Sequence, residues 1–170
     1  MAVKIVILFL LCPWYVSAEI FLNKQARYFA DERCEWNIHS VMTLLEDRWG
    51  NQQVFSPGSC VWAKIIPRVD ESGVYYLETE VALAHGIVIF LPPIEQRLDS
   101  FQLGADGRIH QDLYPHWNYV VPLRLIQGED RPLYIRYGNP RQIHVPLKLW
   151  TQDSFLSMTH HFALRHGFSI

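Results

Sequence analysis

Glu78 and Glu80 are the residues of this sequence whose spacing most resembles a catalytic pair. Two positions apart on a strand, they share one face and lie roughly 7 Å from each other. Inverting glycosidases use carboxylates at about this separation, so a glycoside hydrolase is the enzymatic alternative. The solvated outer face of a sheet carries the same pattern without any chemistry. The sequence adds no glycine-rich phosphate loop and no nucleophile elbow, and we expect no enzymatic activity.

His160, His161 and His166 gather near the C-terminus and raise the question of a metal site. Metal ligands on one helix face stand three or four residues apart, as in the HExxH arrangement. These histidines are separated by one, five and six residues, so they do not share a face. We expect neither a metal nor a cofactor. An interfacial role, in which the histidines titrate at extracellular pH, is favoured instead.

Aromatic side chains favour binding over catalysis. A tryptophan ring offers a flat apolar face on which a sugar stacks, while polar neighbours bond its edge groups. In a β-sandwich, however, aromatic residues are commonly core residues, and alternation assigns Tyr119 to the core together with Val121 and Leu123. Trp150 lies on the opposite side of its strand from Leu149, so we expect Trp150 to be an exposed aromatic residue.

Polar companions complete the candidate ligand site. Arg136 lies between Ile135 and Tyr137 on the polar face of its strand, which suits a ligand contact or an ordinary surface ion pair. The candidate ligand-binding residues are Trp150, Arg136, Trp117, His116, Arg108 and Trp62. Cys34 and Cys60 form a disulfide in one interpretation, since isolated pairs are bridged in oxidising compartments. Two buried thiols are the equal alternative, because spacing alone does not show that the side chains meet.

Strands must position most of these residues, because period-two alternation dominates after residue 40. In the run from 75 to 83, Tyr76 and Glu78 fall on the face opposite the apolar one. The run 87–91 is apolar on both faces, as in a central strand covered on both sides. Asp106-Gly107 is a good hairpin turn, and the prolines at 67, 122 and 146 indicate edges, bulges or strand ends. We expect an all-β fold, a jelly-roll β-sandwich of about eight strands.

The segment from Gln152 to His166 is predicted to be a helix. Its apolar residues recur three and four positions apart: Phe155, Met158 and Phe162. Either Asp153 or Ser154 is the expected N-cap, and Gly167 the expected stop.

The first 18 residues have the pattern of a secretory signal peptide. Lys4 is followed by an apolar stretch from Ile5 to Val16. Val16-Ser17-Ala18 then provides small residues at the positions that signal peptidase reads. This stretch is shorter than the roughly 20 residues that span a bilayer. We expect cleavage before Glu19, with an uncleaved N-terminal anchor as the alternative. Net charge is −2, with no basic stripe, which excludes nucleic acid as a partner, and a hydrophobic content of 49% excludes disorder.

Several stretches resemble a family of receptor domains. They are Phe55–Ser59 with Val61–Ile65, Tyr75–Glu78, Pro115–Leu123, and Pro132–Arg136 followed by Val145–Trp150. Residues 34 to 170 are thereby similar to the periplasmic sensor domain, type 2, of bacterial seven-transmembrane receptors with diverse intracellular signalling modules. The resemblance implies a jelly roll like that of carbohydrate-binding modules, at the outer face of the inner membrane. It implies ligand occupancy passed to membrane helices, and the tail 162–168 resembles the approach to the first of these helices.

Two departures from the family pattern affect the interpretation. Family members often carry an arginine a few residues before the stretch matching Pro115-His116, whereas Gln111-Asp112-Leu113 occupies this region here and Arg108 lies nearby. Membrane helices and an output domain normally follow, whereas this sequence ends at Ile170, so we expect a fragment, a truncation or a stand-alone relative.

We expect a signal peptide at 1–18, a β-sandwich sensor domain at 19–151 and a juxtamembrane-like helix at 152–170. The expected function is periplasmic sensing of a carbohydrate or small carboxylate ligand, with possible membrane-helix partners. Fold-level analogy alone provides the ligand class. The alternatives are a soluble envelope subunit that binds another protein, and a receptor remnant that has no ligand.

Overall fold

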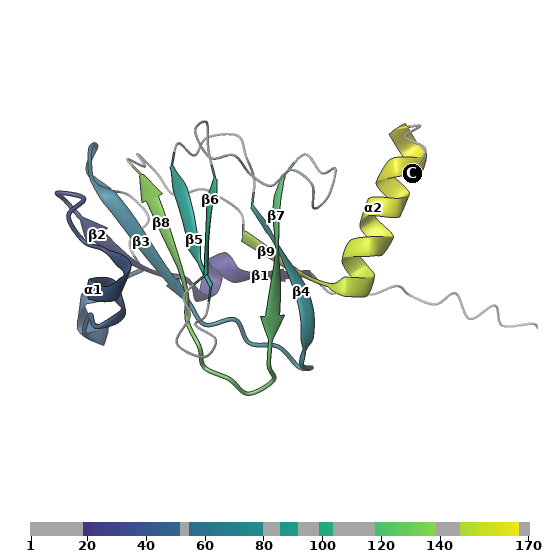
Figure 1. The fold of residues 1–170 in the computed structure, drawn as a ribbon, viewed down its shortest axis with the longest axis horizontal. Coiled ribbons are helices and arrows are strands. Elements are labelled where there is room, and N and C mark those ends of the chain that lie inside the picture. The colour runs from purple at the N-terminus through teal and green to yellow at the C-terminus, as the bar shows by residue number, and fades with distance from the viewer. Residues whose placement is uncertain are drawn as a thin grey trace, which may run out of the picture.

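The computed structural model describes residues 19–51, 55–79, 86–91, 99–103, 118–138 and 147–166. These residues form two antiparallel sheets that face each other, with a helix at the C-terminal end (Figure 1). The strands are β1 (Glu19–Phe21), β2 (Arg27–Asp31), β3 (Cys60–Ile65), β4 (Gly73–Thr79), β5 (Ile87–Phe90), β6 (Ser100–Leu103), β7 (Tyr119–Leu125), β8 (Leu133–Gly138) and β9 (Leu147–Thr151). The helices are α1 (Ile38–Met42) and α2 (Gln152–His166), and the 3-10 helices are η1 (Leu22–Gln25) and η2 (Glu46–Arg48).

The four-stranded sheet has the order β1-β9-β4-β7, and the five-stranded sheet has the order β2-β3-β8-β5-β6. This arrangement confirms the all-β sandwich with a short C-terminal helix, whereas the jelly-roll type stays a prediction. Most strands from β3 onward fall within the runs of alternation seen in the sequence. Strands β1 and β2 were not predicted, because both are short and precede the alternating part of the chain.

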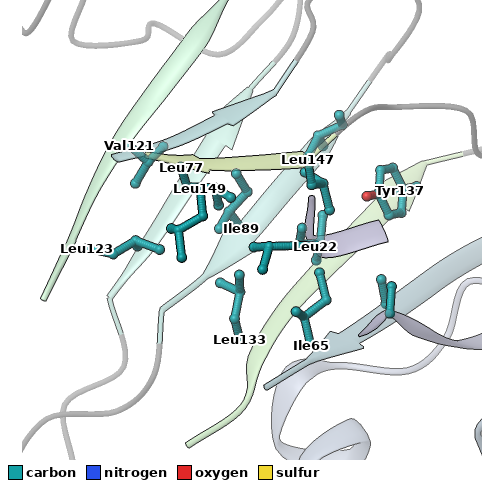
Figure 2. Close-up of a cluster of buried hydrophobic side chains, with 14 of the residues drawn as sticks. Leu22, Ile65, Leu77, Ile89, Val121, Leu123, Leu133, Tyr137, Leu147 and Leu149 are labelled. Atoms are coloured by element: carbon teal, nitrogen blue, oxygen red, sulfur yellow. The ribbon is translucent and has the colours of Figure 1, made fainter. Parts of the chain in front are cut away.

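The core lies between the two sheets (Figure 2). Leu77 and Leu149 are cross-strand partners in the four-stranded sheet, and both are fully buried. Across from them, Ile135 and Leu133 of β8 are equally buried. Leu22, from η1, also enters the core. Each such side chain contributes about 1.5–3 kcal/mol of hydrophobic stabilisation, so the facing inner rows hold the two sheets together.

The beginning of helix α2 packs against β4 and β9 on the outer side of the four-stranded sheet, where two predictions need correction (Figure 1). Trp150 is only 7% exposed, packed in one cluster with Tyr76 and Phe155, so the expected exposed aromatic residue is buried. The rings of Tyr76 and Phe155 stack with centroids 4.5 Å apart. Glu78, expected on a solvated face, is likewise buried. Alternation identified the side of the strand correctly, but it contains no information about a helix packed on that side.

The helix itself spans the predicted residues, but its N-cap differs. Thr151 ends β9, and its Oγ1 accepts a hydrogen bond from the Ser154 backbone N–H at 3.3 Å. Thr151 therefore serves as the cap, and neither Asp153 nor Ser154 does. The helix follows the strand without a connecting loop. The Phe162 side chain and Gly167 lie outside the described residues.

The predicted roles of the prolines and turns have separate outcomes. Pro122 lies within β7, the edge strand of the four-stranded sheet as described, and edge strands are where proline is tolerated. Pro67 follows the end of β3. Pro146 and the turn at Asp106-Gly107 lie outside the described residues.

Candidate functional site

The outer face of the five-stranded sheet carries two rows of side chains that cross all five strands. The Arg136 row contains Phe29, Trp62, Arg136, Val88 and Gln102. The Lys64 row contains Arg27, Lys64, Tyr134, Phe90 and Ser100. These positions alternate with the core-facing residues of the same strands, so they point away from the core. Strands lie about 4.8 Å apart, which puts neighbours within a row in reach of one another.

A cover segment, residues 32–50, lies over part of this face. One buried cluster joins the two layers: Ile38, Val41 and Trp49 of the cover segment with Phe29, Trp62 and Tyr134 of the sheet. Within the segment, the Asn37 side chain caps α1 by accepting the Ser40 N–H at 3.0 Å. Its C-terminal end is fixed by a bridge between Tyr28 and Gly50, with backbone hydrogen bonds of 2.7 and 2.9 Å.

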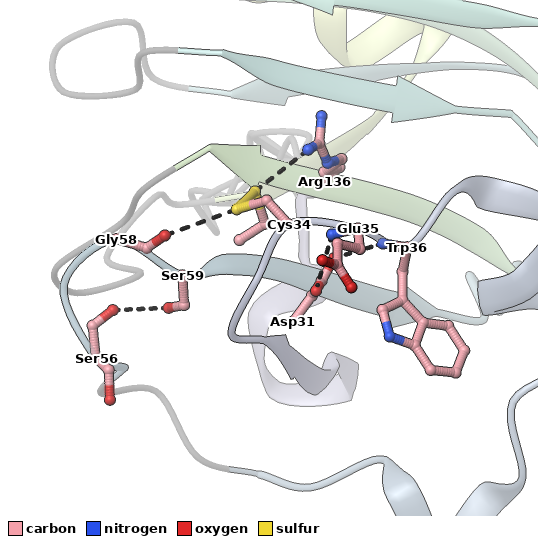
Figure 3. The surroundings of a disulfide bond; sticks show 9 residues. Asp31, Cys34, Glu35, Trp36, Ser56, Gly58, Ser59 and Arg136 are labelled. Carbon is pink, nitrogen blue, oxygen red and sulfur yellow. Dashed lines mark hydrogen bonds between the residues drawn. A yellow bond between two sulfur atoms is a disulfide. The ribbon is translucent and has the colours of Figure 1, made fainter.

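The other end of the cover segment is fixed by a disulfide between Cys34 and Cys60 (Figure 3). The buried Asp31 carboxylate supports the same turn, because it accepts the backbone N–H groups of Glu35 and Trp36 at 3.2 and 2.9 Å. The sequence left bridged and free cysteines equally open. In the structure β2 and β3 are neighbours, with Asp31 opposite Cys60, and this register brings the two cysteines together.

Arg136 is the central charged residue of its row. Its Nη2 donates to Cys60 Sγ at 3.3 Å, and its guanidinium carbon lies 5.9 Å from the Trp62 ring centroid (Figure 3). Its buried Nε has no hydrogen-bond partner, and no acidic side chain pairs with Arg136 within the described parts of the chain. A half-buried guanidinium without a carboxylate has lost water contacts that an anionic or polar ligand would replace.

Trp62 does not offer the stacking platform that its residue type suggested. Only 1% of its surface is exposed, because Phe90 stacks on it at 5.6 Å and the cover segment packs beside it. The half-exposed apolar groups on this part of the face are instead Val88 and Phe90. Sequence reasoning missed both, since it treated 87–91 as covered on both sides. The signal was their alternation with Ile87 and Ile89, which are the buried residues of β5.

The structure thus brings Trp62 and Arg136 together as partners across β3 and β8. It separates Trp150 from them, because Trp150 belongs to the four-stranded sheet. Arg108, His116 and Trp117 lie outside the described residues, in the stretch that joins β6 to β7.

Glu78 is buried and hydrogen-bonded within the fold. Its Oε1 accepts the Asn118 side-chain amide at 2.6 Å, and its Oε2 accepts the Trp150 indole N–H at 2.6 Å. Both oxygens therefore hold neighbouring elements together. Glu80, its supposed catalytic partner, lies outside the described residues. Among the residues that the structure describes, no three metal-ligating side chains come together, and no helix is long and apolar enough to cross a bilayer.

The Lys64 row ends in a charged cluster. Glu46 of the cover segment accepts a hydrogen bond from Lys64 Nζ and lies 3.6 Å from Arg27 Nη1. The hydrogen bond from Lys64 lowers the pKa of Glu46, and the positive charges of Lys64 and Arg27 act in the same direction. Burial raises the pKa of Tyr134, and the negative charge of Glu46 adds to the effect. The lowered pKa keeps the Glu46 carboxylate charged at neutral pH.

The family model for the 7TMR-DISM extracellular 2 domain matches residues 23–151, which include most of both sheets. The chain belongs to this family. The resemblance carried by the sequence motifs is confirmed, and the 7TMR-DISM extracellular 2 assignment indicates a sensor domain of a receptor, located outside the cytoplasm.

Other comparisons add little to this family assignment. A solved α-xylosidase of glycoside hydrolase family 31 from Xanthomonas citri is similar over 75% of this chain and 15% of that chain, with 11% identity and a TM-score of 0.30. A similarity this low gives no information about the activity of this chain. A search of curated proteins finds no match.

Proposed function

We propose that this protein is a non-enzymatic sensor domain that recognises a small ligand for a seven-transmembrane signalling receptor. The ligand is a carbohydrate or a small carboxylate, and it binds around Arg136 on the outer face of the five-stranded sheet. The observation that carries this proposal is the half-buried Arg136 guanidinium, which pairs with no carboxylate in the described part of the chain. Family membership supports the receptor context.

The neighbours of Arg136 suit such a ligand. A guanidinium presents paired N–H donors that match the two oxygens of a carboxylate or adjacent sugar hydroxyls. Val88 and Phe90 offer half-exposed apolar surface for the C–H groups of the ligand, and the exposed Gln102 amide offers both a donor and an acceptor. Val88 lies between Arg136 and Gln102 in the row, so a ligand with two or more polar groups can contact both Arg136 and Gln102.

Transmission would run through α2. The helix packs on Tyr76 and Trp150, and it follows β9 directly. In a receptor, a ligand that binds one arrangement of sandwich and helix more tightly would shift the population toward that arrangement. The membrane helices of the receptor are the proposed downstream partner. Export by a signal peptide cleaved before Glu19 would place the domain in the periplasm.

A thermal-shift screen of the purified chain, exported under its own N-terminal segment, tests the proposal. Sugars, organic acids and peptidoglycan fragments are compared at periplasmic pH. A ligand that binds only the native state raises the melting temperature by mass action, so one class should produce a dose-dependent rise. Arg136→Gln should abolish the rise, while Arg124→Gln, an exposed arginine on the other sheet, should retain it. A rise that survives Arg136→Gln would overturn the proposed site.

A protein-binding envelope subunit is the second candidate. The cover segment exposes Leu45 at 72%, together with Met42 and Trp36. Exposed apolar residues that gather on one segment are typical of interaction surfaces. If the ligand panel gives no response in a folded sample, and Leu45→Ser disrupts an assembly seen by light scattering, this candidate replaces the sensor.

A further inference from the structure

A charged hollow lies beside the Lys64 row, away from Arg136. Its lining consists of Gln25, Arg27, Glu46, Lys64, Ile66 and Arg68. Three cations thus face one carboxylate, so the hollow has an excess of positive charge. Gln25, Ile66 and Arg68 come from outside the strands, from the end of η1 and the stretch after β3. Segments distant in sequence therefore meet in this hollow.

The three cations are used differently. Lys64 is held in place, because its side chain is only 14% exposed, bonds Glu46 and lies with Nζ 5.7 Å from the Trp49 ring centroid. Arg27 is more exposed and lies 3.6 Å from the same carboxylate. Arg68 is exposed and makes no ion pair with any described residue. Arg68 therefore has no acidic partner among these residues, and the three cations of the hollow exceed its one carboxylate by two charges.

The Glu46 carboxylate is the group that a ligand could displace from Lys64 and Arg27. It sits on the three-residue η2 and its side chain is 67% exposed, so water can replace its contacts readily. Exposed ion pairs of this kind contribute little stability. The lowered pKa of Glu46 reflects the hydrogen bond and charge that Lys64 and Arg27 provide to a carboxylate at this position. The fixed part of the hollow is hence built to hold carboxylate oxygens, and its present occupant is loosely attached.

We propose that this hollow is a second binding site, which takes a small molecule with two or more carboxylates. One carboxylate replaces that of Glu46 on Lys64 and Arg27, and another pairs with Arg68. Glu46 acts as an internal competitor that occupies the site when the ligand is absent. The site is separate from the Arg136 row and does not depend on the proposed function.

Calorimetric titration of the purified chain with citrate, at low ionic strength and neutral pH, tests this site. Removing the competitor in Glu46→Gln should tighten citrate binding about two- to five-fold, the range set by an exposed ion pair. Arg68→Gln should weaken it by at least a comparable factor. Glu32→Gln and Arg124→Gln make the same charge changes at exposed positions outside the hollow and serve as matched controls. Thermal melts verify that each variant is folded.

Specific outcomes overturn the proposal. It fails if Glu46→Gln behaves like Glu32→Gln, or if Arg68→Gln behaves like Arg124→Gln. Inorganic phosphate that binds as tightly as citrate would overturn the assignment to carboxylates. Repeating the titrations with Arg136→Gln in every chain separates the two proposals, because the hollow predicts that the Glu46 and Arg68 effects persist. If the effects of the Glu46 and Arg68 variants vanish with Arg136→Gln, citrate binds at Arg136, and the proposed second site is wrong while the proposed Arg136 site is retained.

Discussion

Glu78 and Arg136 are charged side chains that point away from the core on opposite sheets, yet their surroundings differ. Glu78 is buried, and its two oxygens accept hydrogen bonds from Asn118 and from Trp150 of β9. Arg136 lies beside the cover segment with a buried Nε that has no partner in the described residues. A buried charged group whose hydrogen bonds are all made within the protein stabilises the fold, whereas one without such bonds is costly unless another group binds it. The four-stranded sheet holds α2 through Tyr76 and Trp150, and the five-stranded sheet is where we propose that the ligand binds.

The largest expected loss follows from removing the ring that fixes α2. Phe155→Ala should lower the free energy of unfolding by about 3–5 kcal/mol, because Phe155 is fully buried and stacks on Tyr76. Urea denaturation measures this loss. Leu156→Ala, on the exposed side of the same helix, is the control, since it should change stability by at most about 0.5 kcal/mol. Similar losses for the two variants would mean that α2 is not docked on the sheet.

The next effect concerns the cover segment of the other sheet. The Cys34–Cys60 disulfide closes a loop with a sequence separation of 26, so Cys34→Ser with Cys60→Ser should cost about 3.5 kcal/mol by loop entropy. Melting with and without reductant measures the change. The double variant should become insensitive to reductant, and a wild-type chain that is already insensitive would show that the bridge does not form.

Glu78→Gln tests the satisfied charge itself. Glutamine keeps one acceptor oxygen but faces the Trp150 or Asn118 donor with an amide N–H, so about 2 kcal/mol of stability should be lost. Arg136→Gln should cost less stability than Glu78→Gln, because it removes only the contacts with Cys60 and Trp62, while it abolishes ligand binding. Denaturation and ligand titration of both variants give the two values. If Arg136→Gln is more destabilising than Glu78→Gln, the contrast between a structural Glu78 and a ligand-binding Arg136 is wrong.

The smallest effect is the pH dependence of the Glu46 cluster, which faces Lys64 of β3, Arg27 of β2 and Tyr134 of β8. Because folding lowers the pKa of Glu46 below its ordinary value of 4.5, its contribution is complete above that value. The contribution disappears as pH falls through the lowered pKa, when folded Glu46 takes up a proton. Wild type should exceed Glu46→Gln by at most about 1 kcal/mol at pH 7 and by nothing near pH 2. Denaturation at both pH values measures this difference.

Sequence patterns predicted the parts of the molecule that depend on local periodicity. Alternation located Tyr119 on the core side of its strand, and three- and four-residue spacing located α2. The exposure of Trp150 and Glu78 was predicted wrongly, because burial of a strand's second face depends on which element packs there. For Trp62 the same reason applies, since the cover segment reaches it from residues distant in sequence. The pairing of Trp62 with Arg136 required strand order, which no single strand encodes.

The direct junction between β9 and α2 sets the rotational phase of the helix. Thr151 is at once the last residue of a paired strand and the cap of the helix, so no flexible residue separates them. An α-helix turns about 100° per residue. One alanine inserted after Thr151 would therefore rotate every later side chain by about that angle relative to the sandwich, whereas a full turn would need about 3.6 residues. The end of β9 therefore determines which side of α2 packs on the sheet and which side faces outward.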